Sequence, residues 1–315
     1  MRESNVIETN GKHAMHLKPL LLVTFAVALG TGSLSVAAQI QIKPPTITNP
    51  DRVKPYPPLR IIGNLYYVGT YDLAVYLITT PAGHMLINTG YGESTGKIRA
   101  NVEALGFKFM DIKLLLATHG HGDHVGAMAE IKKITGARML MHEGDADLLE
   151  TGAIPDYRFP QGRPAPIYEP VKVDQRLKEG DKVRLGDTEL TVIHHPGHTK
   201  GSTSFSYTVR EGGRDYNVLI VNMATINPGV QVLFMQAFPE ITKAYMTTIQ
   251  RQKQLQPDVW VSSHAGHFNL HQKYKPGDPY DPKRFVDPDG YQAKLQFYEK
   301  LFTGRLMKEQ EAKAE

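Results

Sequence analysis

Short apolar runs separated by glycine and polar turn residues dominate the chain after position 58. They are rich in β-branched and aromatic residues, which is typical of strands. The run at 112–119 is largely apolar and predicts a buried strand. Between the runs, Ile98, Val102 and Leu105 recur at helical spacing, so the pattern predicts an amphipathic helix over 96–105. The other strand-like runs of this first half lie at 59–69, 74–80, 84–90 and 137–143.

The second half of the chain repeats this alternation. Residues 202–223 predict a hairpin around Gly212 and Gly213, and residues 240–256 predict a helix. Residues 258–264 predict the last strand. A charged helix over 289–313 is expected to face inward through Leu295, Tyr298, Leu301 and Phe302.

Two mixed sheets stacked face to face, with helices outside, would bury all these apolar runs. We therefore expect an α/β fold of four layers, an αββα sandwich. No internal linker interrupts the pattern, so residues 39–315 are interpreted as one domain.

The N-terminal segment has the three parts of a secretory signal peptide. Lys12 and Lys18 precede the apolar run at 20–29, and small residues follow up to Ala38. We expect residues 1–38 to be a signal peptide cleaved after Ala38, which predicts a periplasmic or secreted protein. The alternative is an uncleaved membrane anchor, although the run is shorter than the ~20 residues of a membrane span.

Composition narrows the chemistry. The 315 residues include no cysteine, which excludes thiolate metal sites, disulfides and a cysteine nucleophile. The formal net charge of +4 is too small to indicate nucleic acid binding. We expect a small-molecule substrate, no nucleic acid partner, no membrane contact after signal cleavage, and a monomer.

Two proline-rich segments interrupt the regular pattern. Residues 43–58 contain six prolines and predict an extended arm that lies on the surface or over a site. Residues 152–172 contain five prolines and predict a long loop, which in a compact domain usually serves function. The aromatic residues Phe159 and Tyr168 of this loop are candidates for a wall that contacts substrate; the alternative is a plain surface loop.

The segment 118–124 gathers three histidines and one aspartate directly after the predicted strand at 112–118. Period-two spacing lets His119 and His121 project to one side, while Asp123 and His124 face a second point. Imidazole and carboxylate are the ligands that zinc takes when thiolate is absent. The segment therefore predicts a metal site.

Two more histidines lie at the ends of predicted strands. His198 is in the turn at 195–202 between two strands, and His264 comes just past the strand at 259–263. Each would complete one group of three ligands and leave an open position, as catalytic zinc requires. We expect two zinc sites, one from His119, His121 and His198, the other from Asp123, His124 and His264.

These segments, His-x-His-x-Asp-His, Pro-Gly-His-Thr and Ser-His-Ala-Gly, resemble the metallo-β-lactamase superfamily across nearly the whole mature chain. They are similar to subclass B3 in particular, which has histidine in place of cysteine at the second site. The Asn227-Pro228-Gly229 turn strengthens this resemblance. It implies the αββα sandwich and a zinc-dependent hydrolase that opens the β-lactam ring of antibiotics, and hence antibiotic resistance.

The resemblance also implies roles for single residues. A hydroxide shared by two Zn²⁺ ions would attack the lactam carbonyl, with Asp123 orienting it and accepting its proton later. The first ion would polarise the carbonyl, and the second would stabilise the leaving nitrogen. Thr225 and Asn227 are candidates to bind the substrate carboxylate; the alternative is that both only shape the turn.

Other features keep a second function open. Asn88 replaces an aspartate common in the family, and Met223 or Ala224 stands where B3 enzymes often have serine. A dizinc hydrolase of another ester, lactone or amide on the same fold is the alternative, and a silent metal-binding module is a third. Lactonase-like relatives usually bridge the two metals with an aspartate from the strand that corresponds to 219–224. This strand contains no carboxylate here, which favours the lactamase-like arrangement.

Overall fold

The computed structural model describes residues 41–314. The predicted signal peptide, residues 1–38, lies outside these residues, and it stays a prediction. None of the helices from 41 to 314 is both long and apolar enough to cross a membrane.

The first sheet has seven strands in the order in which they occur along the chain. The pairs from β1 to β4 are antiparallel, whereas β4 to β7 are parallel, so the sheet is mixed. Its strands are β1 (Leu59–Ile62), β2 (Leu65–Tyr67), β3 (Tyr76–Thr80), β4 (Gly83–Ile87), β5 (Ile112–Leu116), β6 (Arg138–His142) and β7 (Gln175–Leu177).

The second sheet has five strands in the order β12-β11-β10-β9-β8. Its central hairpin pairs β10 with β11 around the predicted Gly212-Gly213 turn, while β12 runs parallel to β11. The strands are β8 (Lys182–Leu185), β9 (Thr188–His194), β10 (Thr203–Glu211), β11 (Arg214–Val221) and β12 (Val259–Ser262).

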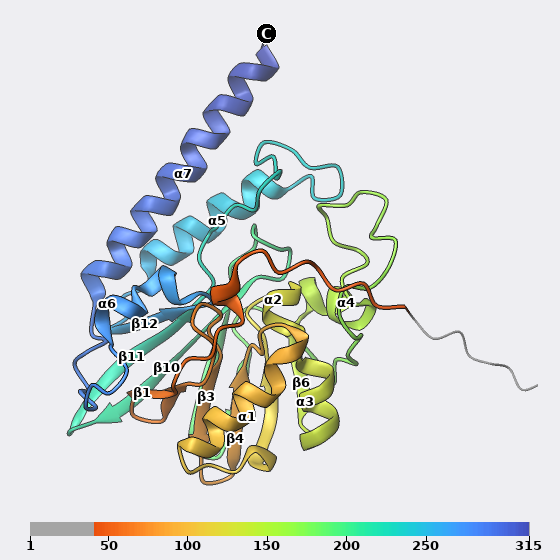
Figure 1. Cartoon of the computed structure of the whole chain (residues 1–315). Helices are drawn as coiled ribbons and strands as arrows, with labels where there is room; N and C mark the ends of the chain where they lie inside the picture. Colours follow the sequence, from red (N-terminus) through yellow and green to blue (C-terminus); the bar gives the residue numbers. More distant parts are fainter. Residues whose placement is uncertain (1–40, 315) are drawn as a thin grey trace, which may run out of the picture. The chain divides into compact units, whose positions relative to one another are not determined.

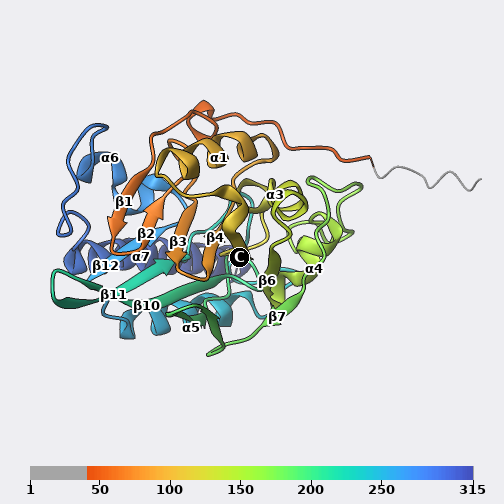
Figure 2. The same cartoon turned by 90° about the horizontal axis from the view of Figure 1, so that it is seen from below.

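Helices cover the outer faces of both sheets, which confirms the predicted four layers. Figure 2 shows α1 and α3 above the first sheet, the second sheet below it, and α5 underneath. A large apolar cluster fills the space between the sheets, and the described residues belong to one compact unit. The helices are α1 (Thr95–Ala104), α2 (Gly122–Val125), α3 (Met128–Thr135), α4 (Glu143–Thr151), α5 (Ile241–Gln254), α6 (Leu270–Lys273) and α7 (Pro288–Ala314).

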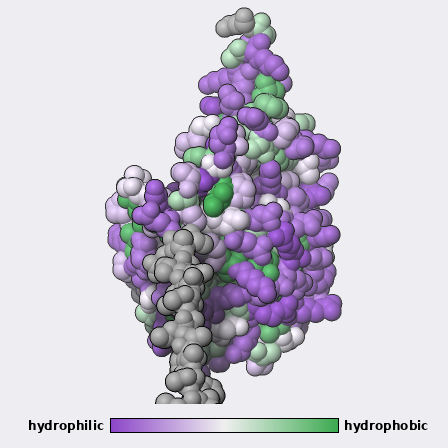
Figure 3. All heavy atoms as spheres, turned by 90° about the vertical axis from the view of Figure 1, so that its right-hand side faces the viewer, coloured by the Kyte–Doolittle hydropathy of each residue, from purple (hydrophilic) through white to green (hydrophobic). Residues whose placement is uncertain are grey.

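The C-terminal helix α7 differs from its prediction at one residue. Leu295, Tyr298 and Phe302 are buried, as expected, but Leu301 is 49% exposed. The three buried residues lie on one stripe at spacings of three and four, and Leu301 falls beside that stripe. The helix ends beyond the body of the molecule, where Figure 3 shows a mostly polar surface with isolated apolar residues.

The turns that carry the candidate ligands meet at one edge of the two sheets. The turn after β5 is joined to the start of β10, because the backbone N–H of Thr203 donates to the carbonyl of Thr118 over 2.7 Å. The hydroxyls of Thr118 and Ser263 are 3.0 Å apart, which brings in the segment after β12. Hydrogen bonds between the sheets thus hold three distant segments together.

Asp145, in the first turn of α4, links two of these segments through its buried carboxylate. Its oxygens accept hydrogen bonds from the backbone of Gly120 at 2.9 Å and of Gly201 at 2.7 Å. The Thr199 hydroxyl donates a third, at 2.5 Å. The approach is so close that a Cβ atom on Gly201 would lie 2.3 Å from the Asp145 backbone nitrogen. Only glycine fits there.

We expect Asp145→Asn to lower the free energy of unfolding at pH 7 by about 1–3 kcal/mol, because the amide NH₂ must face one of the two backbone N–H groups. Urea unfolding of the metal-free protein, followed by circular dichroism, measures this change. An unchanged midpoint and slope would show that the carboxylate does not hold the turns.

The same carboxyl predicts a pH dependence. Burial raises the pKa of Asp145 to about 6, against hydrogen bonds from Thr199, Gly120 and Gly201 that lower it. The folded state therefore binds this proton more tightly than the unfolded state, so the stability due to Asp145 grows as the pH falls from about 6 towards 4. Between pH 7 and 5 the stability difference between wild type and Asp145→Asn should widen by about 1 kcal/mol in urea unfolding. A difference that narrows contradicts the assignment.

Candidate metal centre

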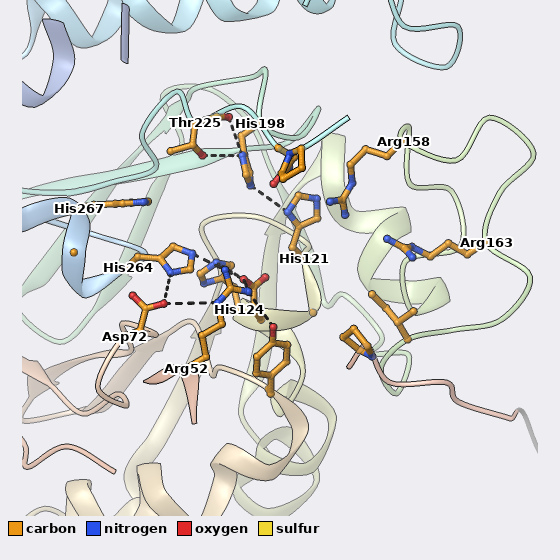
Figure 4. Close-up of a pocket in the computed structure, with 18 residues that line it drawn as sticks. Arg52, Asp72, His121, His124, Arg158, Arg163, His198, Thr225, His264 and His267 are labelled. Atoms are coloured by element: carbon orange, nitrogen blue, oxygen red, sulfur yellow. Dashed lines mark hydrogen bonds and ion pairs between the residues drawn. The ribbon is translucent and has the colours of Figure 1, made fainter. Parts of the chain in front are cut away.

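The first group of candidate ligands comes from two turns. His119 and His121 follow β5, and His198 lies between β9 and β10. One ligand atom from each lies within 4.8 Å of the others, and all three rings are buried. The Nδ1 atom of His121 is 3.1 Å from Nε2 of His198, so two ring nitrogens face the same small space. Figure 4 shows the rings of His121 and His198 pointing towards each other.

The second group lies next to the first. Asp123 and His124 open α2, and with His119 they form another set whose ligand atoms lie within 4.8 Å. The Oδ2 atom of Asp123 is 3.7 Å from Nε2 of His124 and 3.9 Å from Nε2 of His264. The structure thus brings all six predicted ligands together, although they span positions 119 to 264.

The donor atoms suit a metal ion. Burial lowers the pKa of His119, His121 and His124 well below the ordinary histidine value, and that of His198 to about 4. These imidazoles are therefore neutral at pH 7, which is the form that binds metals. Within the described chain, the buried Nε2 of His119 has no hydrogen-bond partner. Neutral imidazoles and one carboxylate without cysteine form a donor set that zinc accepts.

Neighbouring groups fix how two of the rings point. The Nδ1–H of His198 donates to the carbonyl of Thr225 over 3.0 Å, which directs Nε2 towards His121. The Nδ1–H of His264 donates to the Asp72 carboxylate over 3.1 Å, which directs Nε2 towards Asp123. Such partners set the tautomer and orientation of metal-binding histidines. Asp72 was not predicted from the sequence, since an acidic residue in a turn gives no distinctive signal.

The proline-rich arm reaches this site, which confirms that it lies over a site. Arg52, in a short 3₁₀ helix (Pro50–Arg52), donates to Asp123 Oδ2 at 3.2 Å and to the Tyr91 hydroxyl at 3.1 Å. The backbone N–H of Lys43 donates to the carbonyl of Pro166, so the arm also joins the 152–172 loop. Arg52 was not predicted from the sequence, because most arginines in an extended arm are solvated.

A cavity of about 630 Å³ opens over both ligand groups. Thr225 and Asn227 line it, as their predicted role requires, but Phe159 and Tyr168 are absent from its lining. Tyr168 is buried and donates to the Gly120 carbonyl at 2.7 Å, so it packs beneath the turn. The expected aromatic wall is therefore wrong.

Three other residues of the 152–172 loop, Arg158, Arg163 and Ile167, line the cavity instead. Phe159 is 40% exposed and lies under the Arg163 guanidinium. The functional importance of the loop was predicted, whereas its charge was not.

Asn88 and Met223, the two departures from the family pattern, both support the fold around the site. Asn88 adopts a left-handed conformation with φ of 65°, which asparagine tolerates better than most residues. Its Oδ1 accepts from the backbone N–H of Thr118 at 2.9 Å and supports the start of the ligand turn. Met223 is buried in the core between the sheets.

Solved structures share this architecture. The chain is 48% identical to the class B3 di-zinc metallo-β-lactamase LRA-12 from an Alaskan soil metagenome, over 84% of this chain and 100% of that one, with a TM-score of 0.81. It is 44% identical to the metallo-β-lactamase GOB-18 from Elizabethkingia meningoseptica, over 85% of this chain and 98% of that one, with a TM-score of 0.82.

Curated sequences match over a shorter stretch. A hydroxyacylglutathione hydrolase from Rhodopseudomonas palustris (strain BisB5) is 32% identical over 133 residues, which is 42% of each protein. One from Cereibacter sphaeroides is 36% identical over 93 residues, 30% of this chain and 28% of that protein. The chain thus matches less than half the length of these relatives. The sequence model of the protein family described as the metallo-β-lactamase superfamily matches residues 71–211. This chain belongs to the metallo-β-lactamase superfamily, and it is a hydrolase with a histidine-rich metal-binding site.

Proposed function

We propose that the protein is a β-lactamase that holds two zinc ions and opens the ring of β-lactam antibiotics. The observation that carries this proposal is the ligand set. Asp123 is the one carboxylate in the two ligand groups formed by the described residues. The end of β11 continues as Asn222, Met223 and Ala224, so no second carboxylate bridges the groups from that strand.

The chain's own residues would position the lactam between the groups. Zinc, when bound, supplies a Lewis acid for the carbonyl oxygen and makes water a nucleophile at neutral pH. In the proposed binding mode, the lactam carbonyl lies at the first group, formed by His119, His121 and His198. The ring nitrogen lies at the second group. Asp123 belongs to the second group and has a carboxylate oxygen within 4.8 Å of a ring nitrogen of His119 in the first. Its carboxylate can therefore accept the proton of the attacking water and pass it to the departing nitrogen.

Thr225 contacts one candidate ligand through two of its atoms. Its carbonyl and its hydroxyl both contact Nδ1 of His198, at 3.0 and 2.8 Å, so it orients a ligand. The Nδ2 of Asn227 has no hydrogen-bond partner among residues 41–314. Binding of the substrate carboxylate by Thr225 and Asn227 stays a prediction.

Thioester hydrolysis is the second candidate, because the curated relatives carry the name hydroxyacylglutathione hydrolase. The solved structures of LRA-12 and GOB-18, which match this chain over 100% and 98% of their length, are named β-lactamases. This favours a lactam over a thioester as the substrate. We further propose export to the periplasm, through the signal peptide at 1–38, and a contribution to antibiotic resistance.

Purified protein loaded with zinc should hydrolyse at least one of a penicillin, a cephalosporin and a carbapenem. The loss of lactam absorbance measures this hydrolysis. The same preparation is assayed with an acyl-homoserine lactone and with S-D-lactoylglutathione. Turnover of only the lactone or the thioester would reject the β-lactamase proposal in favour of the alternative. Inactivity towards all of these substrates with two bound zinc ions would support a silent metal-binding module.

Removal of the metal should abolish activity, and added zinc should restore it.

His198→Ala and His264→Ala each remove one ligand from a different group. Each should therefore lower bound zinc from two ions to about one per chain and weaken zinc affinity at least about tenfold. Elemental analysis after dialysis measures the stoichiometry. His271→Ala is the matched control, since His271 bonds to the Tyr71 carbonyl outside both groups. Two zinc ions in both ligand variants would refute the two-site assignment.

A further inference from the structure

Two arginines of the 152–172 loop stand at one end of the cavity. Arg158 and Arg163 both line it. Figure 4 shows Arg158 reaching towards His121, with Arg163 beyond it on the same side. Arg158 shares the lining of this cavity with His121 and His198 of the first ligand group. Arg158 therefore lies beside the first ligand group.

A buried carboxylate holds the two guanidinium groups in place. Asp156, with a side chain only 1% exposed, accepts from Nε and Nη2 of Arg158, at 3.0 and 2.6 Å. Its Oδ2 also accepts from Nη2 of Arg163 at 3.0 Å. Two cations share one anion, since neither arginine pairs with another carboxylate in the described part of the chain. The cluster keeps a net positive charge.

The arginines retain unused donors. The buried Nε of Arg163 has no hydrogen-bond partner among residues 41–314. A planar guanidinium with free N–H groups suits a carboxylate, which it can bind through two parallel hydrogen bonds. The side chains of Arg158 and Arg163 are only 25% and 16% exposed, so such bonds would be shielded from water.

The opposite end of the cavity has no such excess of positive charge. There Arg52 lies within 3.7 Å of Asp72 and 3.2 Å of Asp123, so two carboxylates face one guanidinium. An anionic group on a ligand is therefore attracted to the loop end.

The chemistry of the lactam identifies which substituent meets this end. The orientation under "Proposed function" puts the carbonyl at the first ligand group. In a penicillin the acylamino substituent sits on the carbon next to that carbonyl, whereas the ring carboxylate sits next to the nitrogen. Arg158, which lines the cavity beside His121 and His198, therefore faces the acyl substituent.

We propose that Arg158 and Arg163, held by Asp156, form a subsite for a carboxylate on the acyl side chain of the substrate. This inference rests on the proposed β-lactamase function and adds a preference within it: lactams with an anionic acyl group are bound more tightly than their neutral counterparts.

The test compares benzylpenicillin with its α-carboxy derivative, which differ by one carboxylate on the acyl group. The measured quantity is the ratio of kcat/KM for the α-carboxy compound to that for benzylpenicillin. In Arg158→Met and Arg163→Met this ratio should fall about tenfold, mainly through KM, because a charge-assisted hydrogen bond is lost. Arg158→Lys keeps the charge without the fork, so its ratio should fall less.

Arg210→Met is the matched control, because Arg210 is an exposed arginine on β10 paired with Asp215. Its ratio should equal that of the wild type. Because each ratio is taken within one variant, a general loss of folded protein or zinc cancels. Ratios within twofold of wild type in both methionine variants would overturn the subsite.

A binding measurement separates this inference from the proposed function. Titration calorimetry of the metal-free protein with the two penicillins should show tighter binding of the α-carboxy compound, and Arg158→Met should remove the difference. If neither penicillin is hydrolysed, the β-lactamase proposal fails, and the titration alone decides the subsite. Equal affinity of wild type for the two compounds would overturn it.

Discussion

The whole site depends on hydrogen bonds from backbone N–H groups and a threonine hydroxyl to the buried carboxylate of Asp145. Each ligand turn belongs to a different part of the chain, and a turn alone has no reason to keep one position. Asp145 joins the turn after β5 to the turn before β10, and α4 supplies the rigid support. Burying a carboxylate is costly, and its hydrogen bonds to both turns offset that cost. The cost is tolerated where a fixed distance between two ligand groups is required.

The site is also asymmetric in charge. One end pairs Arg52 with Asp72 and Asp123, and the other leaves Arg158 and Arg163 with the single carboxylate of Asp156. The fold supplies the neutral imidazoles between them, since burial keeps those rings unprotonated. The metal groups thus belong to the sandwich, whereas the charge around them comes from the arm and the loop. This division lets the surroundings of the site vary while the ligands stay in place.

The sequence predicted the sandwich and the six converging side chains because both follow from local patterns. Apolar runs define buried strands, and the candidate ligands follow strand ends that the topology brings to one edge. The rest depends on burial, which local pattern does not reveal. Arg52, Asp72 and Arg158 look like ordinary surface charges in the sequence, and only the structure shows that they line the cavity.

Individual misses have similar causes. Strand β7, three residues with two exposed polar side chains, carries too little apolar signal to be predicted. Tyr168 was expected in a cavity wall because aromatic residues in functional loops often contact ligands. Its hydroxyl instead points at two backbone carbonyls beneath the turn, that of Gly120 at 2.7 Å and that of Leu148 at 3.0 Å.

Helix α7 has a consequence for the turn that carries Asn227. Its residue Phe302 shares an apolar cluster with Ala224 and Val230, which flank the turn carrying Asn227. The turn at the cavity is thus backed by a helix whose other face is open to solvent. The bulk of Phe302 is thus linked to the turn by packing from behind, away from every candidate metal ligand. A survey of cavity residues alone would therefore overlook a route from the C-terminal helix to the site.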